Sequence, residues 1–472
     1  MTPLHDVLIV GGGIAGLAAA YELRVRGIRF QLLERATRVG GVILTEEVDG
    51  FTIDAGPDSL LVQKPAAIAL CRDLGLDERL FPTNTPRTAY VLRGGVLHPL
   101  PEASILGIPT TLWPLAQTGL FTLTGKARMA AELAVPRRRD PSDESIGAFM
   151  RRRFGAEAVA YLAEPLLAGI HAGDVERLSM RALFPALVDA ERRYGSVIRA
   201  FRTMRPAGSG EGAFRSLPGG IGELVAAIVR ALPVGSVRTA TATATVERDH
   251  LTDSFRVRTE AGDVITARSV IVATPAWVAA DQIAAIDAEL AALCRSIRYT
   301  STATVVLSYL RSSVHHPLGG SGFVAPRVER TPLMAASWVS SKWPHRAPPG
   351  QVLLRAFLGG AYDPDALARG DDELIETAER ELSGILGITG LRGMAMVYRW
   401  PRASAQHEVG HVDRMAAIDR RLARWPGLYL TGSGFRGVGI PDCVADARAT
   451  AAAAAQHLAR ESLLRGQDRG GL

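Results

Sequence analysis

Three glycines and one acid near the start of the chain have the types and spacing that bind a dinucleotide. Gly11, Gly13 and Gly16 follow a short apolar run, and Glu34 ends the next such run. Gly11 permits a tight turn, Gly13 lets the backbone approach a pyrophosphate, and Gly16 lets a helix pack closely on a strand. Glu34 stands where an acid hydrogen-bonds a ribose hydroxyl, and its charge would repel the 2′-phosphate of NADP. These residues predict a dinucleotide site, with a glycine-rich turn as the alternative.

The elements around these residues have the order that such a site requires. The apolar run at 6–10 predicts a buried strand, the spacing at 14–26 predicts a helix, and 30–33 predicts a second strand. The glycines then lie at the N-terminus of the helix, where unpaired N–H groups and the helix dipole stabilise phosphate charge. Two further strands of the same sheet and an alanine-rich helix are predicted at 264–273, 427–431 and 440–459.

Two more glycine-rich segments favour FAD over NAD. Gly40 and Gly41 follow Arg38, and this pair resembles the extension of flavin amine-oxidase-type proteins that approaches the flavin phosphates. A second tight turn is the alternative. The segment 432–441 also leads into a helix, where backbone N–H groups would face the charge that develops on a reduced flavin. Turns alone explain two such distant strand–helix junctions poorly.

Composition and charge are those of an ordinary globular enzyme. The chain has 472 residues, of which 47% are hydrophobic and 22% charged, so we expect at least two lobes and little disorder. The net charge of +6 favours anionic partners such as carboxylated substrates, but no recognised module accompanies it, so we expect no nucleic-acid binding. Cys71, Cys294 and Cys443 form no CxxC pair. They therefore predict neither a disulfide framework nor a metal site.

We expect a cytoplasmic protein with no transmembrane segment. The N-terminal residues lack a basic stretch followed by a short apolar core and a cleavage site. The longest uncharged stretch, 103–125, is interrupted by Pro109, Pro114 and several polar residues, which is wrong for a spanning helix. At most this stretch would touch a membrane surface.

These patterns predict an α/β fold: a discontinuous Rossmann-like FAD-binding domain with an inserted α+β substrate domain and a helical lobe. Strands at 302–310, 333–339 and 352–357 with a helix at 371–386 would supply the second sheet, joined by a hairpin at 88–98. The alternating run 239–245 is also predicted as a strand. We assign 1–85, 212–295 and 400–472 to the FAD-binding domain, 86–102 and 296–399 to the substrate-binding domain, and 103–211 to the helical lobe.

The chain resembles the FAD-dependent protoporphyrinogen and coproporphyrinogen oxidases of haem synthesis over nearly its whole length. The N-terminal glycine motifs are shared by a wider superfamily, whereas 167–174, Trp400 and the segment around Cys443 are much more restricted. The matching segments are 11–16, 34–35, 38–41, 54–59, 99–101, 107–110, 166–174, 217–220, 399–401, 409–411 and 437–443.

This resemblance implies roles for individual residues. It places Gly169 and Ile170 at the porphyrinogen macrocycle and makes the helical lobe the part that would face a membrane. In two departures from the family pattern, Val42 replaces a flavin-adjacent tryptophan and His407 replaces a common tyrosine. The residues expected to bind FAD are Gly11, Gly13, Ile14, Ala15, Gly16, Glu34, Arg35, Gly40, Gly41, Val42, Gly56, Pro57, Asp58, Val246, Trp400, Val438, Gly439 and Ile440.

The implied activity is the six-electron oxidation of coproporphyrinogen III to coproporphyrin III, and also of protoporphyrinogen IX. FAD would accept the hydrides, O2 would reoxidise it to give H2O2, and no side-chain base is required. His171, His407 and His411 are expected to be core or hydrogen-bonding histidines.

Lys64 is the residue expected to distinguish the two substrates. It would face a substrate propionate, with a solvated lysine as the alternative, and coproporphyrinogen III carries four propionates against two on protoporphyrinogen IX. A downstream enzyme of haem synthesis is a candidate partner. The competing functions are another flavin amine oxidase, a carotenoid desaturase, or a flavin- or porphyrin-binding scaffold without turnover.

Overall fold

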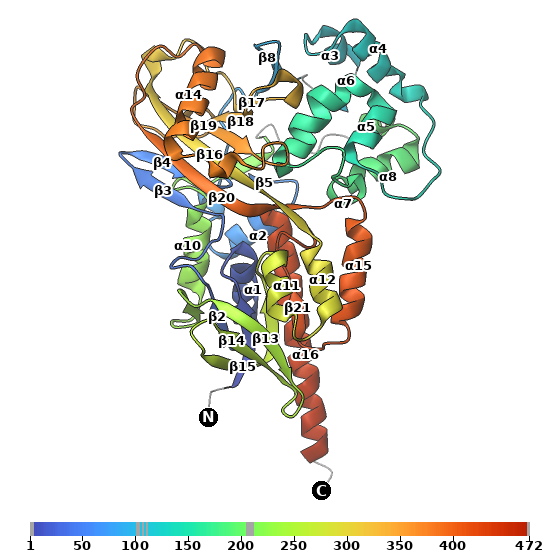
Figure 1. Ribbon diagram of the computed structural model, residues 1–472, viewed down its shortest axis with the longest axis vertical. Helices are drawn as coiled ribbons and strands as arrows, with labels where there is room; N and C mark the ends of the chain where they lie inside the picture. The colour runs from blue at the N-terminus through green and yellow to red at the C-terminus, as the bar shows by residue number, and fades with distance from the viewer. Residues whose placement is uncertain (1–3, 101–103, 106–107, 110–111, 204–211, 470–472) are drawn as a thin grey trace.

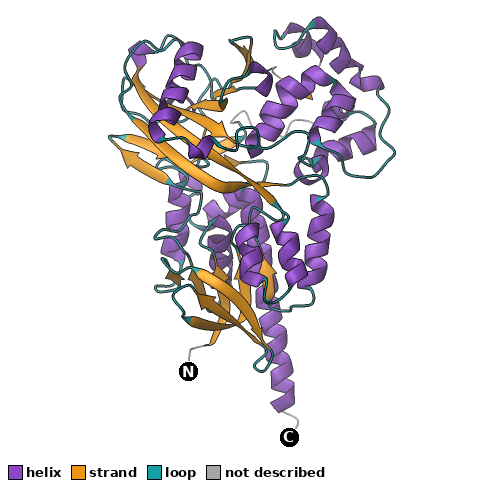
Figure 2. Cartoon of the chain, in the orientation of Figure 1, coloured by secondary structure: helices purple, strands orange, loops and turns teal. Residues whose placement is uncertain are grey.

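The computed structural model describes residues 4–100, 104–105, 108–109, 112–203 and 212–469. The molecule is elongated, with one sheet in its lower half, a second sheet in its upper half and a group of helices beside the second sheet (Figure 1). Figure 2 shows that helices flank the lower sheet and make up most of the upper right-hand lobe.

The lower sheet is built around parallel strands. β1 lies between β2 and β15, parallel to both, and β21 also pairs with β15 in parallel. β13, β14 and β15 pair in antiparallel fashion. The strands of this sheet are β12 (Val237–Arg238), β2 (Phe30–Leu33), β1 (Leu4–Val10), β15 (Val264–Val272), β14 (Ser254–Thr259), β13 (Thr243–Asp249) and β21 (Leu428–Leu430).

Both faces of β1 are buried. Successive side chains of a strand point to opposite sides, and those of β1 enter a separate core on each side. Val7 and Ile9 belong to the core on one face, and Leu8 and Val10 belong to the core on the other. Burial on both faces is typical of parallel strands in α/β folds. The helices of the first face are α1 (Ile14–Val25), α2 (Ala66–Asp73), α10 (Gly222–Ala231) and α16 (Ile440–Arg469), and those of the second are α11 (Ala276–Ile283), α12 (Ala288–Arg295) and α15 (His411–Leu422).

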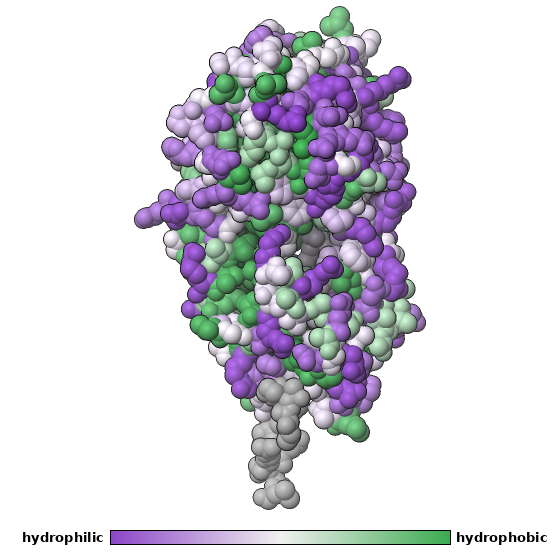
Figure 3. Space-filling model, turned by 60° about the vertical axis from the view of Figure 1, so that its left-hand side comes forward, coloured by the Kyte–Doolittle hydropathy of each residue, from purple (hydrophilic) through white to green (hydrophobic). Residues whose placement is uncertain are grey.

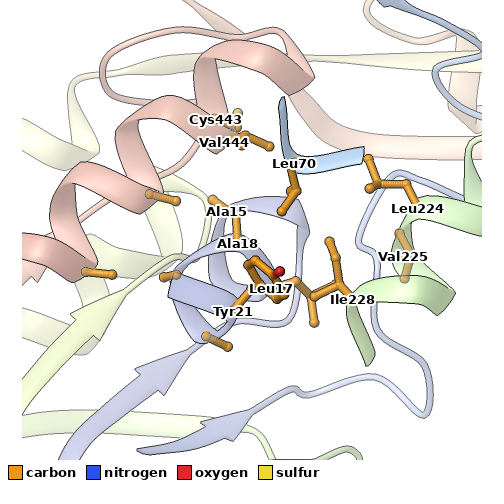
Figure 4. Close-up of a cluster of buried hydrophobic side chains, with 14 of the residues drawn as sticks. Ala15, Leu17, Ala18, Tyr21, Leu70, Leu224, Val225, Ile228, Cys443 and Val444 are labelled. Atoms are coloured by element: carbon orange, nitrogen blue, oxygen red, sulfur yellow. The ribbon is translucent and has the colours of Figure 1, made fainter. Parts of the chain in front are cut away.

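Helix α1 is the centre of the first core. Its small side chains allow α16 to lie close beside it, and Figure 4 shows α1 surrounded by side chains of three other helices. The labelled residues are Ala15, Leu17, Ala18 and Tyr21 of α1, Leu70 of α2, Leu224, Val225 and Ile228 of α10, and Cys443 and Val444 of α16. The N-terminal turn of α1 is thereby fixed against segments from distant parts of the chain.

The upper sheet is mostly antiparallel and is covered on both sides. Val305 and Leu307 of β16 pack in the core that includes α14 (Asp371–Leu386), whereas Val306 packs with Phe51 and Ile53 of a hairpin from the N-terminal region. That hairpin is formed by β3 (Thr45–Val48) and β4 (Phe51–Asp54). The strands, in spatial order, are β20 (Ala395–Gln406), β16 (Arg298–Leu310), β19 (Gln351–Gly359), β18 (Leu333–Trp338), β17 (Gly322–Val324), β7 (Ala89–Arg93) and β8 (Val96–Pro99).

The helical lobe is organised around a buried arginine. Arg153 and Glu132 are both fully buried and form an ion pair, and Glu132 also accepts hydrogen bonds from Ser196 Oγ and the Val197 N–H. The lobe contains α3 (Leu112–Gln117), α4 (Leu123–Ala130), α5 (Ile146–Phe154), α6 (Ala156–Ala158), α7 (Met180–Leu183), α8 (Pro185–Tyr194) and α9 (Val197–Thr203), with a π-helix at Val159–Ala168 and a short 3₁₀ turn at Gly169–His171.

The remaining short elements connect these parts. They are α13 (Val339–Lys342), the three-stranded sheet of β5 (Leu60–Leu61), β11 (Phe214–Ser216) and β6 (Phe81–Pro82), and the pair β9 (Ser104–Ile105) and β10 (Ile108–Pro109).

The predicted elements of both sheets are confirmed to within a few residues, with one correction. The run predicted as a strand at 239–245 becomes β13 only from Thr243, because Ala240 has a φ of 49°, which a strand does not allow. The alanine-rich helix predicted at 440–459 extends to Arg469. The domain boundaries given above stay a prediction.

None of the helices in the described part of the chain combines the length and the hydropathy that a bilayer crossing requires. On the face drawn in Figure 3, hydrophilic residues cover much of the surface and hydrophobic residues gather at mid-height.

Candidate active site

The first glycine turn has the geometry that its spacing predicts. Gly11 has a φ of 104°, and a Cβ there would lie 3.0 Å from the backbone of Ala273. A Cβ on Gly16 would collide with the carbonyl oxygen of Gly11, so α1 and β1 pack together only with glycine at that position. A Cβ on Gly13 would have no atom within 4 Å. The space in front of Gly13 is therefore open to a bound group.

Glu34 closes the turn from the end of β2. Its Oε2 accepts a hydrogen bond from the Gly12 N–H at 2.6 Å, and its Oε1 accepts one from the Ala36 N–H at 2.8 Å. The carboxylate is only partly buried, which leaves lone pairs for a ligand hydroxyl. Arg35, the next residue, is exposed.

The second glycine pair lies directly against the first turn. The Gly40 N–H donates to the Gly12 carbonyl at 2.8 Å, and a Cβ on Gly41 would lie 3.3 Å from the Cα of Gly13. The Arg38 guanidinium holds this loop by donating to the carbonyls of Gly41 and Ile43 at 2.7 and 3.1 Å. Two motifs that are separate in the sequence thus form one glycine-lined surface.

The glycine-lined surface continues to the upper sheet. A Cβ on Gly56 would collide with the carbonyl oxygen of Val42 and would lie 3.8 Å from the Trp400 ring. The Trp400 Nε1–H donates to the Ala55 carbonyl at 3.3 Å, which joins β20 to the turn after β4. The side chain of Val42 is 43% exposed. An elongated ligand that starts at Gly13 would cover Val42 and end beside Trp400.

A pair of stacked histidines supports the third glycine-rich segment. The rings of His407 and His411 lie 3.8 Å apart at an angle of 10°. His407 Nε2 bonds to the carbonyl of Ser433 at 3.1 Å, and His411 Nε2 bonds to that of Phe435 at 2.7 Å. Burial, together with the neighbouring His411, lowers the pKa of His407 to about 3. Both rings are therefore neutral at physiological pH.

Lys64 contacts the first turn of the helix that follows this segment. Its Nζ lies 2.7 Å from Asp442 Oδ2, and the lysine side chain is half exposed. Burial and the positive charge of Lys64 lower the pKa of His171 to about 4. The 3₁₀ turn Gly169–His171 is held by a hydrogen bond of 2.9 Å from Gln406 Nε2 to the His171 carbonyl. Ile170 in that turn is 70% exposed, which leaves an apolar side chain for a ligand.

The side chain of Asp58 is held by residues from the upper half of the molecule. Its carboxylate is buried and accepts hydrogen bonds from Lys342 Nζ at 2.9 and 3.0 Å and from Trp343 Nε1 at 3.3 Å, and Arg355 Nη2 lies 3.2 Å away. These cations hold the pKa of Asp58 far below its usual range, although burial opposes them. The Asp58 carbonyl also accepts a hydrogen bond from Ser216 Oγ at 3.0 Å, and the place of Asp58 at the cofactor stays a prediction.

The side chain of Val246 points into the core, and its place at the cofactor stays a prediction. It lies in β13, is fully buried and packs in the core of the lower sheet with Phe255 and Val257. Val438 and Gly439 lie at the surface beside Asp442, and Ile440 begins α16 with its side chain buried in the first core. Among the residues that the structure describes, no group of three or more His, Cys, Asp or Glu side chains is arranged to hold a metal ion.

Asp442, Lys342 and Arg355 were not predicted from the sequence as residues of the site. Arg355 carries the clearest signal that was available, because it is a single charged residue inside the otherwise apolar run 352–358. A charge at such a position is rarely buried without a partner.

The residues fit a flavin dinucleotide. The open space at Gly13, the glycine-lined surface towards Trp400 and the exposed side chain of Val42 suit an elongated cofactor. Gly13, Gly41 and Glu34 would hold its phosphates and ribose, and the turn after β4 with Trp400 would lie at its ring end.

Comparison with known proteins identifies the class to which this fold and site belong. The chain belongs to the family described as flavin containing amine oxidoreductase, which matches residues 14–455. This match confirms the predicted α/β fold class, the oxidoreductase class and FAD as the cofactor.

Particular relatives are porphyrinogen oxidases by name. The coproporphyrinogen III oxidase of Bacillus subtilis (strain 168) is 38% identical over 468 residues, which cover 96% of this chain and 98% of the relative. That of Staphylococcus aureus is 32% identical over 479 residues, covering 94% and 98%. The crystal structure of the "putative protoporphyrinogen oxidase" of Exiguobacterium sp. superposes with a TM-score of 0.85 at 33% identity, and the match covers 96% of this chain and 99% of that one. The resemblance inferred from the sequence is confirmed.

Proposed function

We propose that the chain oxidises coproporphyrinogen III to coproporphyrin III, and also protoporphyrinogen IX to protoporphyrin IX. The observation that carries this proposal is the contact between Lys64 and Asp442, close to His171. It brings a basic residue and the first turn of the helix after the third glycine-rich segment close to His171, which ends the turn that contains Ile170. The names of the relatives supply the substrate class.

The reaction balances with O2 as the acceptor. Loss of six hydrogens removes three hydrides from bridge carbons and three protons from pyrrole nitrogens, followed by tautomerisation. Bound FAD supplies the hydride acceptor, and three molecules of O2 take up the six electrons and six protons as three molecules of H2O2.

The side chains of this protein would position the cofactor and the substrate rather than transfer protons to or from them. Gly13, Gly41 and Glu34 hold the dinucleotide, and the exposed Ile170 offers an apolar contact to the macrocycle. Lys64 attracts a propionate in competition with Asp442. We assign no side-chain base, which accords with the lowered pKa values of His171 and His407.

We further propose a cytoplasmic location, with the helical lobe as a peripheral membrane contact. Trp113 of α3 and Leu123 of α4 are 71% and 82% exposed and would enter the headgroup region. A downstream enzyme of haem synthesis would receive the porphyrin.

Anaerobic mixing of the yellow protein with coproporphyrinogen III tests the central proposal. We expect the flavin absorbance to bleach and a porphyrin spectrum to appear, and admission of air should restore the flavin and produce H2O2. Bleaching by an amine but not by a porphyrinogen would indicate another amine oxidase. Absence of bleaching with either porphyrinogen would indicate a binding scaffold.

A further inference from the structure

A buried group of charges connects the upper sheet to the turn after β4. It consists of Lys342, Arg346 and Arg355 from the upper half and Asp54 and Asp58 from the turn. Arg346, Arg355 and both carboxylates are each at most 6% exposed. We call these five residues the buried charge cluster. A cluster of this kind is costly to desolvate, so its arrangement calls for a specific role.

Arg355 holds the turn by its backbone as well as by its charge. Its Nη1 donates to the Asp54 carbonyl and, at 2.9 Å, to the Gly56 carbonyl, while its Nη2 lies 3.2 Å from Asp58 Oδ2. One guanidinium from β19 therefore sets the orientation of the Asp54–Ala55 and Gly56–Pro57 peptides. Trp400 completes this hold by donating to the Ala55 carbonyl.

The cluster has more positive than negative charge. Three cations face two carboxylates, and Asp54 pairs with Arg346 at 3.1 Å while Asp58 is shared by Lys342 and Arg355. Nε and Nη1 of Arg346 and Nε of Arg355 are buried and have no hydrogen-bond partner among the described residues. An unbalanced charge in a water-poor environment acts over a longer range than one at the surface.

We propose that Arg355 is a positioning residue for the flavin and that the buried charge cluster favours the reduced, negatively charged form of FAD. This inference rests on the proposed placement of the flavin beside Gly56. A positive excess behind the turn stabilises added negative charge, so it raises the midpoint potential of the bound FAD.

Replacing single charges tests the inference by the sign of the potential shift. Arg355→Met and Lys342→Met each remove a cation and should lower the midpoint potential in an anaerobic dye-linked titration. Asp58→Asn removes an anion and should raise it. We expect roughly a tenfold change in the relative affinity for the two redox states, which is about 30 mV for a two-electron couple.

Arg355→Lys separates charge from geometry. It keeps the cation but loses the planar guanidinium fork that spans the two carbonyls and Asp58, so the potential should stay close to that of the wild type while the affinity for oxidised FAD falls about tenfold or more. The side chain of Lys342 is 14% exposed and lies at the end of the short helix α13, so its removal should disturb the fold less than removal of Arg355. If the Arg355 variants do not fold, Lys342→Met still tests the sign of the potential shift. Arg268→Met, in the middle of β15 in the lower sheet, is the control, since it breaks a largely buried ion pair with Glu461.

Equal potentials in the wild type, Arg355→Met and Lys342→Met would overturn the inference, as would shifts of the same sign for cation and anion removal. The bleaching experiment on the wild type decides the proposed function separately. A protein that bleaches with porphyrinogen but shows no potential shifts retains the proposed function and loses only this inference.

Discussion

Nζ of Lys64 lies 2.7 and 2.8 Å from the two carboxylate oxygens of Asp442, although 378 positions separate the two residues in the chain. Lys64 was expected to face a substrate propionate, with a solvated lysine as the alternative. The structure provides it with a carboxylate partner at the start of the helix that follows the third glycine-rich segment. A propionate that binds at Lys64 would therefore share or displace Asp442.

The contact between Lys64 and Asp442 predicts that substitutions of its two partners have opposite effects on the kinetics with coproporphyrinogen III. Lys64→Ala should lower kcat/KM for coproporphyrinogen III about ten- to a hundredfold, since a charge-assisted hydrogen bond contributes roughly 1.5–3 kcal/mol. The loss should be smaller for protoporphyrinogen IX. Asp442→Asn should free the ammonium and lower KM for the tetracarboxylate. Steady-state kinetics on both substrates, at equal FAD content, would contradict the assignment if the loss were the same for both.

Gly13→Val should remove FAD without unfolding the protein. A Cβ at Gly13 would have no atom of the chain within 4 Å, so the valine should extend into the space where a pyrophosphate would approach. Flavin content after purification and the melting temperature of the apoprotein measure the two effects. Gly384→Val in α14 is the control, because a side chain there also meets nothing. A Gly13→Val protein that stays yellow and fully loaded would exclude this site.

The stacked histidines should make the protein less stable in acid. The pKa of His407 is about 3 in the folded state and 6.5 in the unfolded chain, so the unfolded state binds more protons between these values. The contribution of His407 to the free energy of unfolding is present in full well above pH 6.5, and it is lost as the pH falls from 6.5 towards 3. At pH 5 the contribution of His407 to this loss is about 2 kcal/mol. Urea unfolding at pH 7.5 and 5.0 should show a smaller difference for His407→Gln, and an equal difference in both proteins would refute the assignment.

Arg153→Met should destabilise the helical lobe by about 3–5 kcal/mol, because Glu132 would remain buried without its partner. Arg151→Met provides the comparison within the same helix. Arg151 pairs with Glu176 at the surface, where both side chains are about half exposed, so its loss should cost less than about 1 kcal/mol. Limited proteolysis and urea unfolding measure the difference. Equal stability of the two variants would mean that the buried pair does not organise the lobe.

The sequence by itself determined the elements and the first part of the site. Gly11, Gly16 and Glu34 act through backbone conformation and short-range spacing, so the strand, turn and helix that carry them follow from local rules. The two-faced apolar pattern of β1 likewise predicts a buried parallel strand. The family resemblance adds the substrate class, because it depends on short segments that can be recognised without a structure.

Only the tertiary structure decided which charges meet. The carboxylate of Asp58 is held by Lys342 of α13 and Arg355 of β19, and Asp442 pairs with Lys64. The side chain of Val246 lies in the core of the lower sheet. Electrostatic partners are set by distance in space, and residues from separate sheets come within hydrogen-bonding range only when those sheets pack together.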